Sequence, residues 1–137
     1  MTATAAAFTR LVAAAQAARA HAYAPYSRYR VGAAILTKRG GVHVGCNVEN
    51  ATYGATLCAE RSAIAAMVAS GDNRPVACAI VTAGPRPGTP CGICRQVLSE
   101  FARDMLLLLA SEDEDGRITS RKRAHLAALF PQAFRLG

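Results

Sequence analysis

Apolar and polar residues recur along the first third of the chain in patterns that predict one helix followed by two strands. Strong helix formers fill residues 4–22, with apolar positions at amphipathic spacing, so we expect an opening helix there. The Ala-Pro-Tyr-Ser run at 24–27 ends it. Two apolar segments, residues 30–37 and 42–48, flank a turn at 38–41 made of basic residues and glycine. This arrangement predicts a hairpin.

The rest of the chain alternates helical and strand patterns. Residues 57–69 predict a helix that ends at Ser70-Gly71-Asp72, and residues 76–82 predict a short strand. A glycine- and proline-rich loop at 83–90 leads into a further helix. The remaining predicted elements are a helix at 92–103, a strand at 105–110, an acidic turn at 111–116, a short strand at 117–119 and a closing helix at 122–130. The order αββαβαβ(β)α predicts a three-layer α/β/α fold, with one mixed sheet of about five strands covered by helices on both faces.

The length and composition fit one compact unit. A chain of 137 residues that is 52% apolar suits a single domain spanning residues 1–137. No apolar run approaches the roughly 20 residues that a membrane span needs. The alanine-rich stretch at 2–20 lacks the order of a basic segment before an apolar core that marks a secretory signal. We therefore expect a soluble, cytoplasmic protein without a membrane partner.

The charge and the cysteines narrow the function classes. The formal net charge is +7, but the basic residues are scattered, with a single cluster at Arg121-Lys122-Arg123. No segment interleaves basic and aromatic residues as a nucleic-acid groove requires, so we expect no nucleic-acid partner. Five cysteines, an odd number, argue against a disulfide framework. Metal binding is the better explanation for them.

Two short motifs predict a zinc site. Cys91-Gly92-Ile93-Cys94 places two thiols three residues apart at a predicted helix start, where both can bind one metal. Alone, this motif is also typical of a redox pair or half of a structural zinc site. Cys58-Ala59-Glu60 opens another predicted helix, and residues two apart, separated by roughly 200°, can flank a site beyond the helix end. Cys58 can then bind the metal while Glu60 stays outside its coordination shell as an acid/base group.

Three thiolates leave the fourth tetrahedral position of zinc open for water, as in catalytic sites. Such a site is net negative, and two helix N-termini can compensate for part of the charge. Arg61 and Arg95, each adjacent to a site residue, could bond thiolate sulfurs, and we assign this role to Arg61 in particular. The alternative is a closed structural site with one further ligand. The candidates for that ligand are Cys46, Cys78, His21, His43 and His125, but both cysteines lie in predicted strands, where we expect them to be buried, and the histidines show no ligand spacing.

Four motifs, in order, resemble the homotetrameric zinc-dependent cytidine deaminases. They are YSRYRVGAA at 26–34, GCNVENA at 45–51, CAER at 58–61 and PCGICRQ at 90–96. The resemblance implies one zinc per subunit, held by Cys58, Cys91 and Cys94. It implies hydrolytic deamination of cytidine and deoxycytidine to uridine and deoxyuridine, with release of ammonia, in pyrimidine salvage. Glu60 would shuttle a proton from a zinc-bound water to the ring N3 while the resulting hydroxide attacks C4.

The same resemblance assigns residues to the substrate. Asn47 and Glu49 would hold the ribose 3′-hydroxyl, and Ala59 would contact the nucleoside. Tyr29 would line the nucleoside pocket, where the family more often has Phe. Tyr53 and Phe134 would reach across subunit boundaries, so that neighbouring subunits of a homotetramer complete each active site. The chain departs from the family at its end, where Phe134-Arg135-Leu136-Gly137 replaces the familiar Phe-Gly-Pro.

Three other functions remain open at this point. A deaminase of bases in RNA or DNA would need a groove with stacking residues for flanking nucleotides. A deaminase of a nucleoside antibiotic such as blasticidin S would keep the zinc residues and change the sugar contacts, whereas Asn47 and Glu49 together favour an ordinary nucleoside. A non-catalytic zinc-stabilised binding protein would have no use for an unligated carboxylate at Glu60.

Overall fold

The computed structural model describes residues 4–137, and its elements follow the predicted order. Residues 1–3 lie outside the described part. The elements are α1 (Ala5–Arg19), β1 (Gly32–Thr37), β2 (Val42–Cys46), the 3₁₀ helix η1 (Tyr53–Ala55), α2 (Ala59–Ala69), β3 (Pro75–Ala83), α3 (Gly92–Phe101), β4 (Leu106–Glu112), β5 (Ile118–His125) and α4 (Leu126–Leu129).

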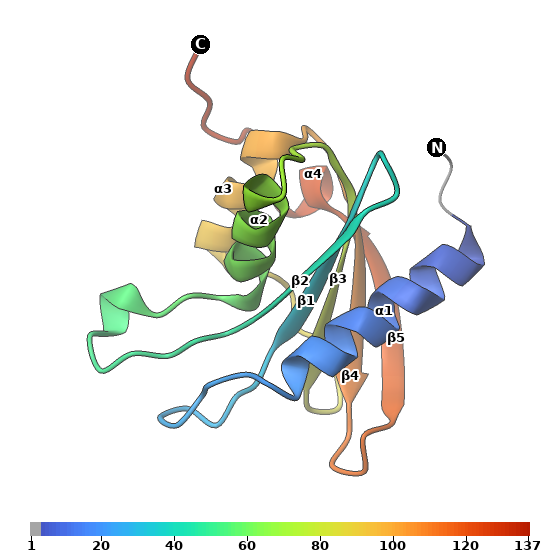
Figure 1. Ribbon diagram of the computed structural model, residues 1–137, viewed down its shortest axis with the longest axis vertical. Coiled ribbons are helices and arrows are strands. Elements are labelled where there is room, and N and C mark those ends of the chain that lie inside the picture. The colour runs from blue at the N-terminus through green and yellow to red at the C-terminus, as the bar shows by residue number, and fades with distance from the viewer. Residues whose placement is uncertain (1–3) are drawn as a thin grey trace.

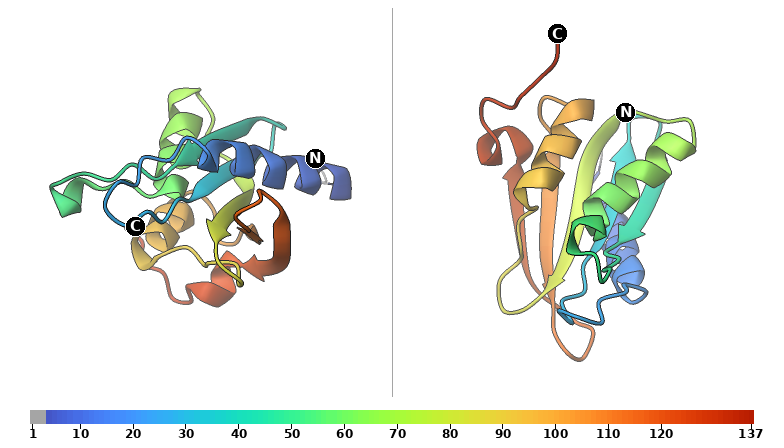
Figure 2. Two further views of the ribbon diagram at one scale, coloured as in Figure 1. Left: turned by 90° about the horizontal axis from the view of Figure 1, so that it is seen from below. Right: turned by 90° about the vertical axis from the view of Figure 1, so that its left-hand side faces the viewer.

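One mixed sheet of five strands, in the order β2-β1-β3-β4-β5, forms the middle layer. β1 pairs antiparallel with β2 and with β3, β3 pairs parallel with β4, and β4 pairs antiparallel with β5. The parallel pair needs a crossover, which α3 supplies. α1 covers one face of the sheet, and α2 and α3 cover the other (Figures 1 and 2). The predicted three-layer α/β/α fold is therefore confirmed.

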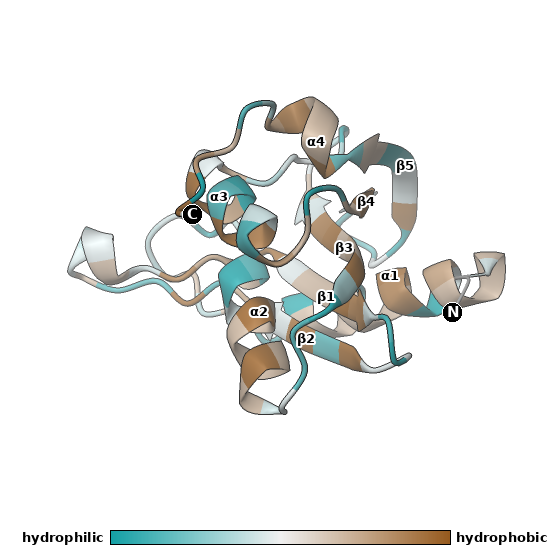
Figure 3. Ribbon diagram, turned by 90° about the horizontal axis from the view of Figure 1, so that it is seen from above, coloured by the Kyte–Doolittle hydropathy of each residue, from teal (hydrophilic) through white to brown (hydrophobic). Residues whose placement is uncertain are grey.

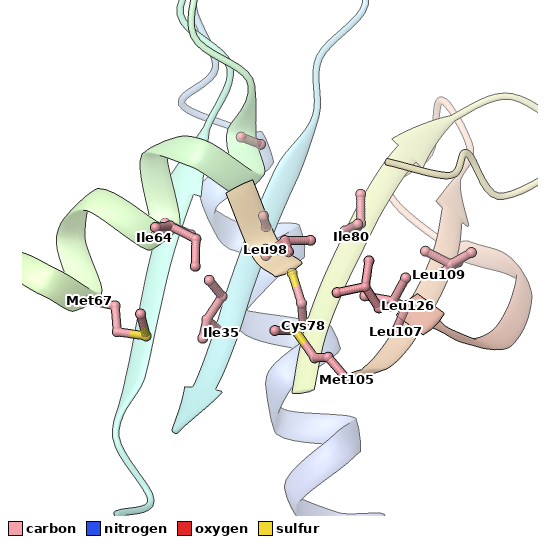
Figure 4. Close-up of a cluster of buried hydrophobic side chains, with 13 residues drawn as sticks. Ile35, Ile64, Met67, Cys78, Ile80, Leu98, Met105, Leu107, Leu109 and Leu126 are labelled. Atoms are coloured by element: carbon pink, nitrogen blue, oxygen red, sulfur yellow. The ribbon is translucent and has the colours of Figure 1, made fainter. Parts of the chain in front are cut away.

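Alternating side chains of the central strands build a separate core on each face. On β1, Ala33 and Ile35 belong to the cluster beneath α2 and α3, whereas Ala34 and Leu36 belong to the cluster beneath α1. This is the period-2 alternation of a strand buried on both sides. Figure 4 shows the first cluster, in which Leu98 of α3 and residues of α2 meet the strands. Both helices that begin at the predicted zinc motifs are thus anchored on one face of the sheet.

The end of the chain differs from the sequence-based expectation. We predicted a short strand at 117–119 and a closing helix at 122–130, but β5 runs over Ile118–His125 and α4 covers only Leu126–Leu129. Arginine and lysine favour helices in isolation, which made 122–125 look helical. Pairing with the apolar strand β4 overrides that preference, and basic side chains suit an exposed edge strand. Figure 3 shows the hydrophilic colour along much of β5.

One glycine sets the position of α2 on the sheet. A Cβ added at Gly45 of β2 would lie 2.4 Å from the amide nitrogen of Ala63 and 2.7 Å from the carbonyl oxygen of Ala59. Only a residue without a side chain therefore lets α2 approach so closely. Between residues 4 and 137, no helix is both long and apolar enough to cross a membrane.

Candidate functional site

Three cysteine sulfurs converge where α2 and α3 begin. Cys58 is the N-cap residue of α2, and Cys91 is the N-cap residue of α3, with Cys94 in the first turn of that helix. Their Sγ atoms all lie within 4.8 Å of one another, and those of Cys58 and Cys91 are 3.8 Å apart. Tetrahedral zinc with Zn–S bonds of about 2.3 Å holds its sulfurs about 3.8 Å apart. The three thiols therefore fit one zinc ion.

Over the described residues, these three cysteines are the whole metal-ligating group. Cys78 is fully buried in the core, as expected, whereas Cys46 at the end of β2 is only half-buried. A set of three thiols leaves one tetrahedral position for water or substrate, which is the arrangement of a catalytic site rather than a closed structural one.

Positive charge faces the sulfurs from several directions. Both helix N-termini point their partial positive charge at the cluster. The Nη2 of Arg61 donates to Cys58 Sγ at 3.3 Å and to the Thr56 carbonyl oxygen at 3.3 Å. Hydrogen bonding with Cys94 and with Arg61 lowers the pKa of Cys58 to about 5, while the contact with Cys58 raises the pKa of Cys94. Arg61 therefore makes the sulfur contact predicted for it.

Glu60 is buried next to the thiols. Glu60 is 5% exposed and lies in the first turn of α2, two residues after Cys58. Burial, together with the charge of Cys58, raises the pKa of Glu60 to about 7. A carboxyl group in this position can both accept and donate a proton near neutral pH.

Cys58, Cys91 and Glu60 line one cavity of about 180 Å³. Its walls come from the segment between α1 and β1, from the end of β2, from β3 and from the loop before α3. The lining residues are Tyr29, Val31, Asn47, Thr56, Cys58, Ala59, Glu60, Ile80, Thr82, Thr89 and Cys91. An acid/base carboxyl, two of the three cysteines of the metal-ligating cluster and an aromatic ring thus line one cavity.

Similarity to known proteins identifies the family. The model of the cytidine and deoxycytidylate deaminase zinc-binding region matches residues 7–109. This chain belongs to that family of zinc-dependent deaminases. A cytidine deaminase from Mycobacterium tuberculosis is 46% identical over 119 residues, 87% of this chain and 83% of that protein. One from Sporosarcina psychrophila is 40% identical over 126 residues, 91% and 89% of the two chains.

A solved structure supports the same assignment. The crystal structure of cytidine deaminase from Burkholderia pseudomallei superposes with a TM-score of 0.82 at 41% identity, covering 92% of this chain and 98% of that one. The deaminase family consists of zinc-dependent hydrolases, so zinc is the cofactor of this protein, and the three thiols are the donor set that fits it.

Several residues that the deaminase resemblance assigned to the substrate lie in the cavity wall. Tyr29, Asn47 and Ala59 all line it. The amide of Asn47 also fastens the wall, because its Oδ1 accepts from the Val31 amide at 2.8 Å and its Nδ2 donates to the Tyr29 carbonyl oxygen at 2.8 Å. The structure therefore brings these three residues to the same space as Glu60.

Three further residues that the resemblance assigned to the substrate or to a neighbouring subunit lie outside the cavity wall. The carboxylate of Glu49 accepts from the amides of Tyr26 and Ser27 at 2.9 and 3.1 Å and from the Ser27 hydroxyl. The Ser27 hydroxyl in particular holds the pKa of Glu49 below its ordinary value. Tyr53 is 81% exposed on the segment that projects from the body of the molecule (Figure 1), and Phe134 is 67% exposed on the C-terminal tail. None of these three belongs to the residues that line the cavity within the described chain.

The contacts of Arg95 differ from our prediction. We predicted that Arg95, like Arg61, could bond a thiolate sulfur. Its guanidinium instead donates to backbone and hydroxyl oxygens of Pro90, Leu129 and Thr89. Side chains at neighbouring helix positions point in different directions, and from its position Arg95 reaches α4.

The cavity also contains residues that sequence reasoning missed. Thr56, Thr82 and Thr89 line it, together with Val31 and Ile80. The hydroxyl of Thr82 accepts from the Gly88 amide at 2.9 Å and so holds the loop before α3. The only sequence signal for Thr89 is its place directly before the Pro90-Cys91 motif.

Proposed function

We propose that the protein hydrolytically deaminates cytidine and deoxycytidine to uridine and deoxyuridine, with release of ammonia. The observation that carries this proposal is the burial of the Glu60 carboxyl beside a cluster of three thiols, two of which line the same cavity as Glu60. The three relatives described above are all named cytidine deaminase, which supports the same substrate class. Residues 1–137 would act as a single deaminase domain.

Cys58, Cys91 and Cys94 would hold the zinc ion. When bound, zinc lowers the pKa of a water ligand so that a nucleophile is available at neutral pH. Arg61 and the two helix N-termini offset the negative charge of the thiolates.

Glu60 would move the protons of the reaction. Its carboxylate accepts a proton from the attacking water and delivers it to the ring N3 of cytosine, which makes C4 more electrophilic. The same carboxylate can then take the remaining proton from the water-derived oxygen on C4 and deliver it to the amine, so that the C4–N bond breaks, ammonia leaves and the C4 carbonyl forms. Burial beside the cavity keeps this exchange away from bulk water.

The remaining wall would bind the nucleoside. Tyr29 offers an aromatic face with a hydroxyl at its edge, and the Asn47 amide has one N–H and one lone pair left after its two backbone bonds. We propose that Asn47 and Glu49 take the ribose 3′-hydroxyl, with Glu49 turning from the Ser27 hydroxyl toward the sugar. The backbone of Ala59 closes the cavity beside the base.

Neighbouring subunits of a homotetramer would complete the site. The cavity of one chain measures about 180 Å³, below the roughly 300 Å³ at which ligand pockets usually begin. Tyr53 and Phe134, both largely exposed, are the side chains that we propose to enter a neighbour's cavity. We place the enzyme in cytoplasmic pyrimidine salvage, because three reduced thiols require a reducing compartment.

Ammonia release from purified protein tests the substrate. We expect rapid turnover of cytidine and deoxycytidine and none of cytosine, blasticidin S, RNA or single-stranded DNA. Turnover of the antibiotic or of a polynucleotide would replace the proposed substrate with one of its rivals. Zinc-loaded protein without turnover of any compound would favour a non-catalytic binding protein. Light scattering that shows a monomer at assay concentration would contradict the roles of Tyr53 and Phe134.

A further inference from the structure

The guanidinium of Arg95 ties together three pieces of the structure. Nε donates to the carbonyl oxygen of Pro90 at 2.8 Å, and Nη1 donates to the carbonyl oxygen of Leu129 at 2.8 Å. Nη2 donates to the hydroxyl of Thr89 at 3.2 Å. One side chain on α3 thus binds two consecutive residues of the preceding loop and the last residue of α4.

The loop that Arg95 holds has few other anchors near Cys91. Pro90 has no amide hydrogen to donate, so its carbonyl oxygen is its remaining backbone attachment point. The exposed thiol of Cys91 accepts a long bond of 3.5 Å from the Cys94 amide and lies 3.8 Å from the Cys58 sulfur. Further back, the Gly88 amide is held by Thr82. Between these points, the Cys91 carbonyl oxygen accepts from the Arg95 amide at 2.9 Å, and the Arg95 guanidinium fixes the Pro90 carbonyl oxygen and with it the orientation of the Pro90–Cys91 peptide.

We propose that Arg95 is a positioning residue that sets the Cys91 thiol and the Thr89 side chain in the cavity wall. The proposal rests on the proposed role of Cys91 as a zinc ligand. Arg95 makes its contacts with a planar fork of donors in fixed directions, which lysine cannot reproduce with a single ammonium group. We call the three hydrogen bonds of the Arg95 guanidinium the clamp. Through Leu129, the clamp also fixes the loop before α3 relative to α4.

The test compares Arg95→Lys with the wild type in zinc release from the loaded protein to a chelating dye. Lysine keeps the positive charge and loses the fork. Because Arg95 acts through the residues directly before Cys91 and does not bond the ligand itself, we expect zinc release to be about 10-fold faster, the lower end of the range for lost partners of a metal ligand. We also expect the KM for cytidine to rise, because Thr89 lines the cavity. Circular dichroism monitors the fold of each variant.

Arg135→Lys is the matched control. Arg135 Nη1 donates to the carbonyl oxygen of Ser99 at 2.8 Å, so it makes the same kind of bond to α3, far from the loop. We expect its zinc release to equal that of the wild type. Equal acceleration in both variants would indicate general loosening of α3 and would overturn the proposal. Wild-type zinc release in Arg95→Lys would overturn it as well.

Thr89→Val decides the question if Arg95→Lys does not fold. This change removes one acceptor of the clamp and preserves the side-chain shape. Faster zinc release, by about twofold or more, supports the clamp, whereas an unchanged rate contradicts it. Wild-type protein that retains no zinc would contradict the proposed function itself. A zinc-loaded wild type with unaffected variants contradicts only the role of Arg95.

Discussion

Asn47 has a structural task in addition to the one expected from its chemistry. Its amide bridges the backbone of Tyr29 and Val31, two residues that face the cavity. A primary amide offers two N–H donors and two lone pairs, so one of each remains for a ligand. The side chain therefore holds the cavity wall in place and can still contact the substrate.

Replacing Asn47 with Ala should affect both tasks. The Val31 amide and the Tyr29 carbonyl oxygen lose their partner, which costs about 1–3 kcal/mol when such groups are buried. Urea denaturation should show this loss, and the KM for cytidine should rise. Asn47→Asp keeps the acceptor for Val31 but turns a carboxylate oxygen toward the Tyr29 carbonyl oxygen, so its stability should also fall below that of the wild type. Unchanged stability in the Ala variant would show that the bridge contributes nothing.

Arg61 should govern how firmly zinc is retained. Its guanidinium contacts Cys58 Sγ, so removal of the side chain leaves the sulfur without a neighbouring cation. The Nε of Arg61 is buried and has no hydrogen-bond partner in the described structure. For Arg61→Ala we expect zinc affinity or kcat to fall about 10- to 100-fold, measured by competitive chelation and ammonia release. Full retention of zinc and activity would show that Arg61 does not contribute to zinc binding.

The spacing within the two motifs allowed Cys58, Glu60, Cys91 and Cys94 to converge, because both motifs begin helices whose N-termini can face one metal. The resemblance to the cytidine deaminases completed that prediction. The same reasoning could not separate Arg61 from Arg95. Each is adjacent in sequence to a site residue, and only the position of α4 shows that Arg95 turns away from the sulfurs. Single threonines such as Thr82 carry no pattern and were missed.

Among the elements, α2 depends most on close packing. It carries Cys58 at its N-cap and Glu60 in its first turn, and its position on the sheet requires the bare backbone at Gly45. The order of the helices and strands could be predicted from the spacing of apolar residues along the chain, but the length of β5 could not. Its basic residues favour a helix locally, and only pairing with β4 makes them a strand.

Gly45→Ala should displace α2 from the sheet. The added methyl group would meet backbone atoms of Ala59 and Ala63, which cannot rotate away. We expect a loss of about 1–3 kcal/mol in unfolding free energy, together with weaker zinc binding. Gly92→Ala is the control for stability, since a Cβ there meets nothing within 4 Å. Equal stability of the two variants would contradict the packing argument.

At the scale of the whole molecule, zinc should link two helices that start far apart in the sequence. Cys58 and Cys91 are 33 positions apart, and each begins a helix on the same face of the sheet. A metal that binds only the folded state stabilises it by about 4 kcal/mol at a thousandfold excess over its dissociation constant.

Removal of zinc by chelation should therefore lower the melting temperature by several degrees. Cys58→Ser should melt at the lower temperature with or without added zinc. Calorimetry of the loaded, chelated and reloaded protein measures the effect. Identical melting of all three samples would show that the thiols do not bind zinc in the folded protein.

The most direct test of the whole account is the conversion of cytidine to uridine by zinc-loaded wild type and by zinc-loaded Glu60→Gln. Glutamine preserves the size of the buried side chain and cannot exchange a proton. We expect full zinc content in both proteins and a kcat about 10²- to 10⁴-fold lower in the Glu60→Gln variant. A variant that retains zinc and deaminates cytidine at the wild-type rate would contradict it.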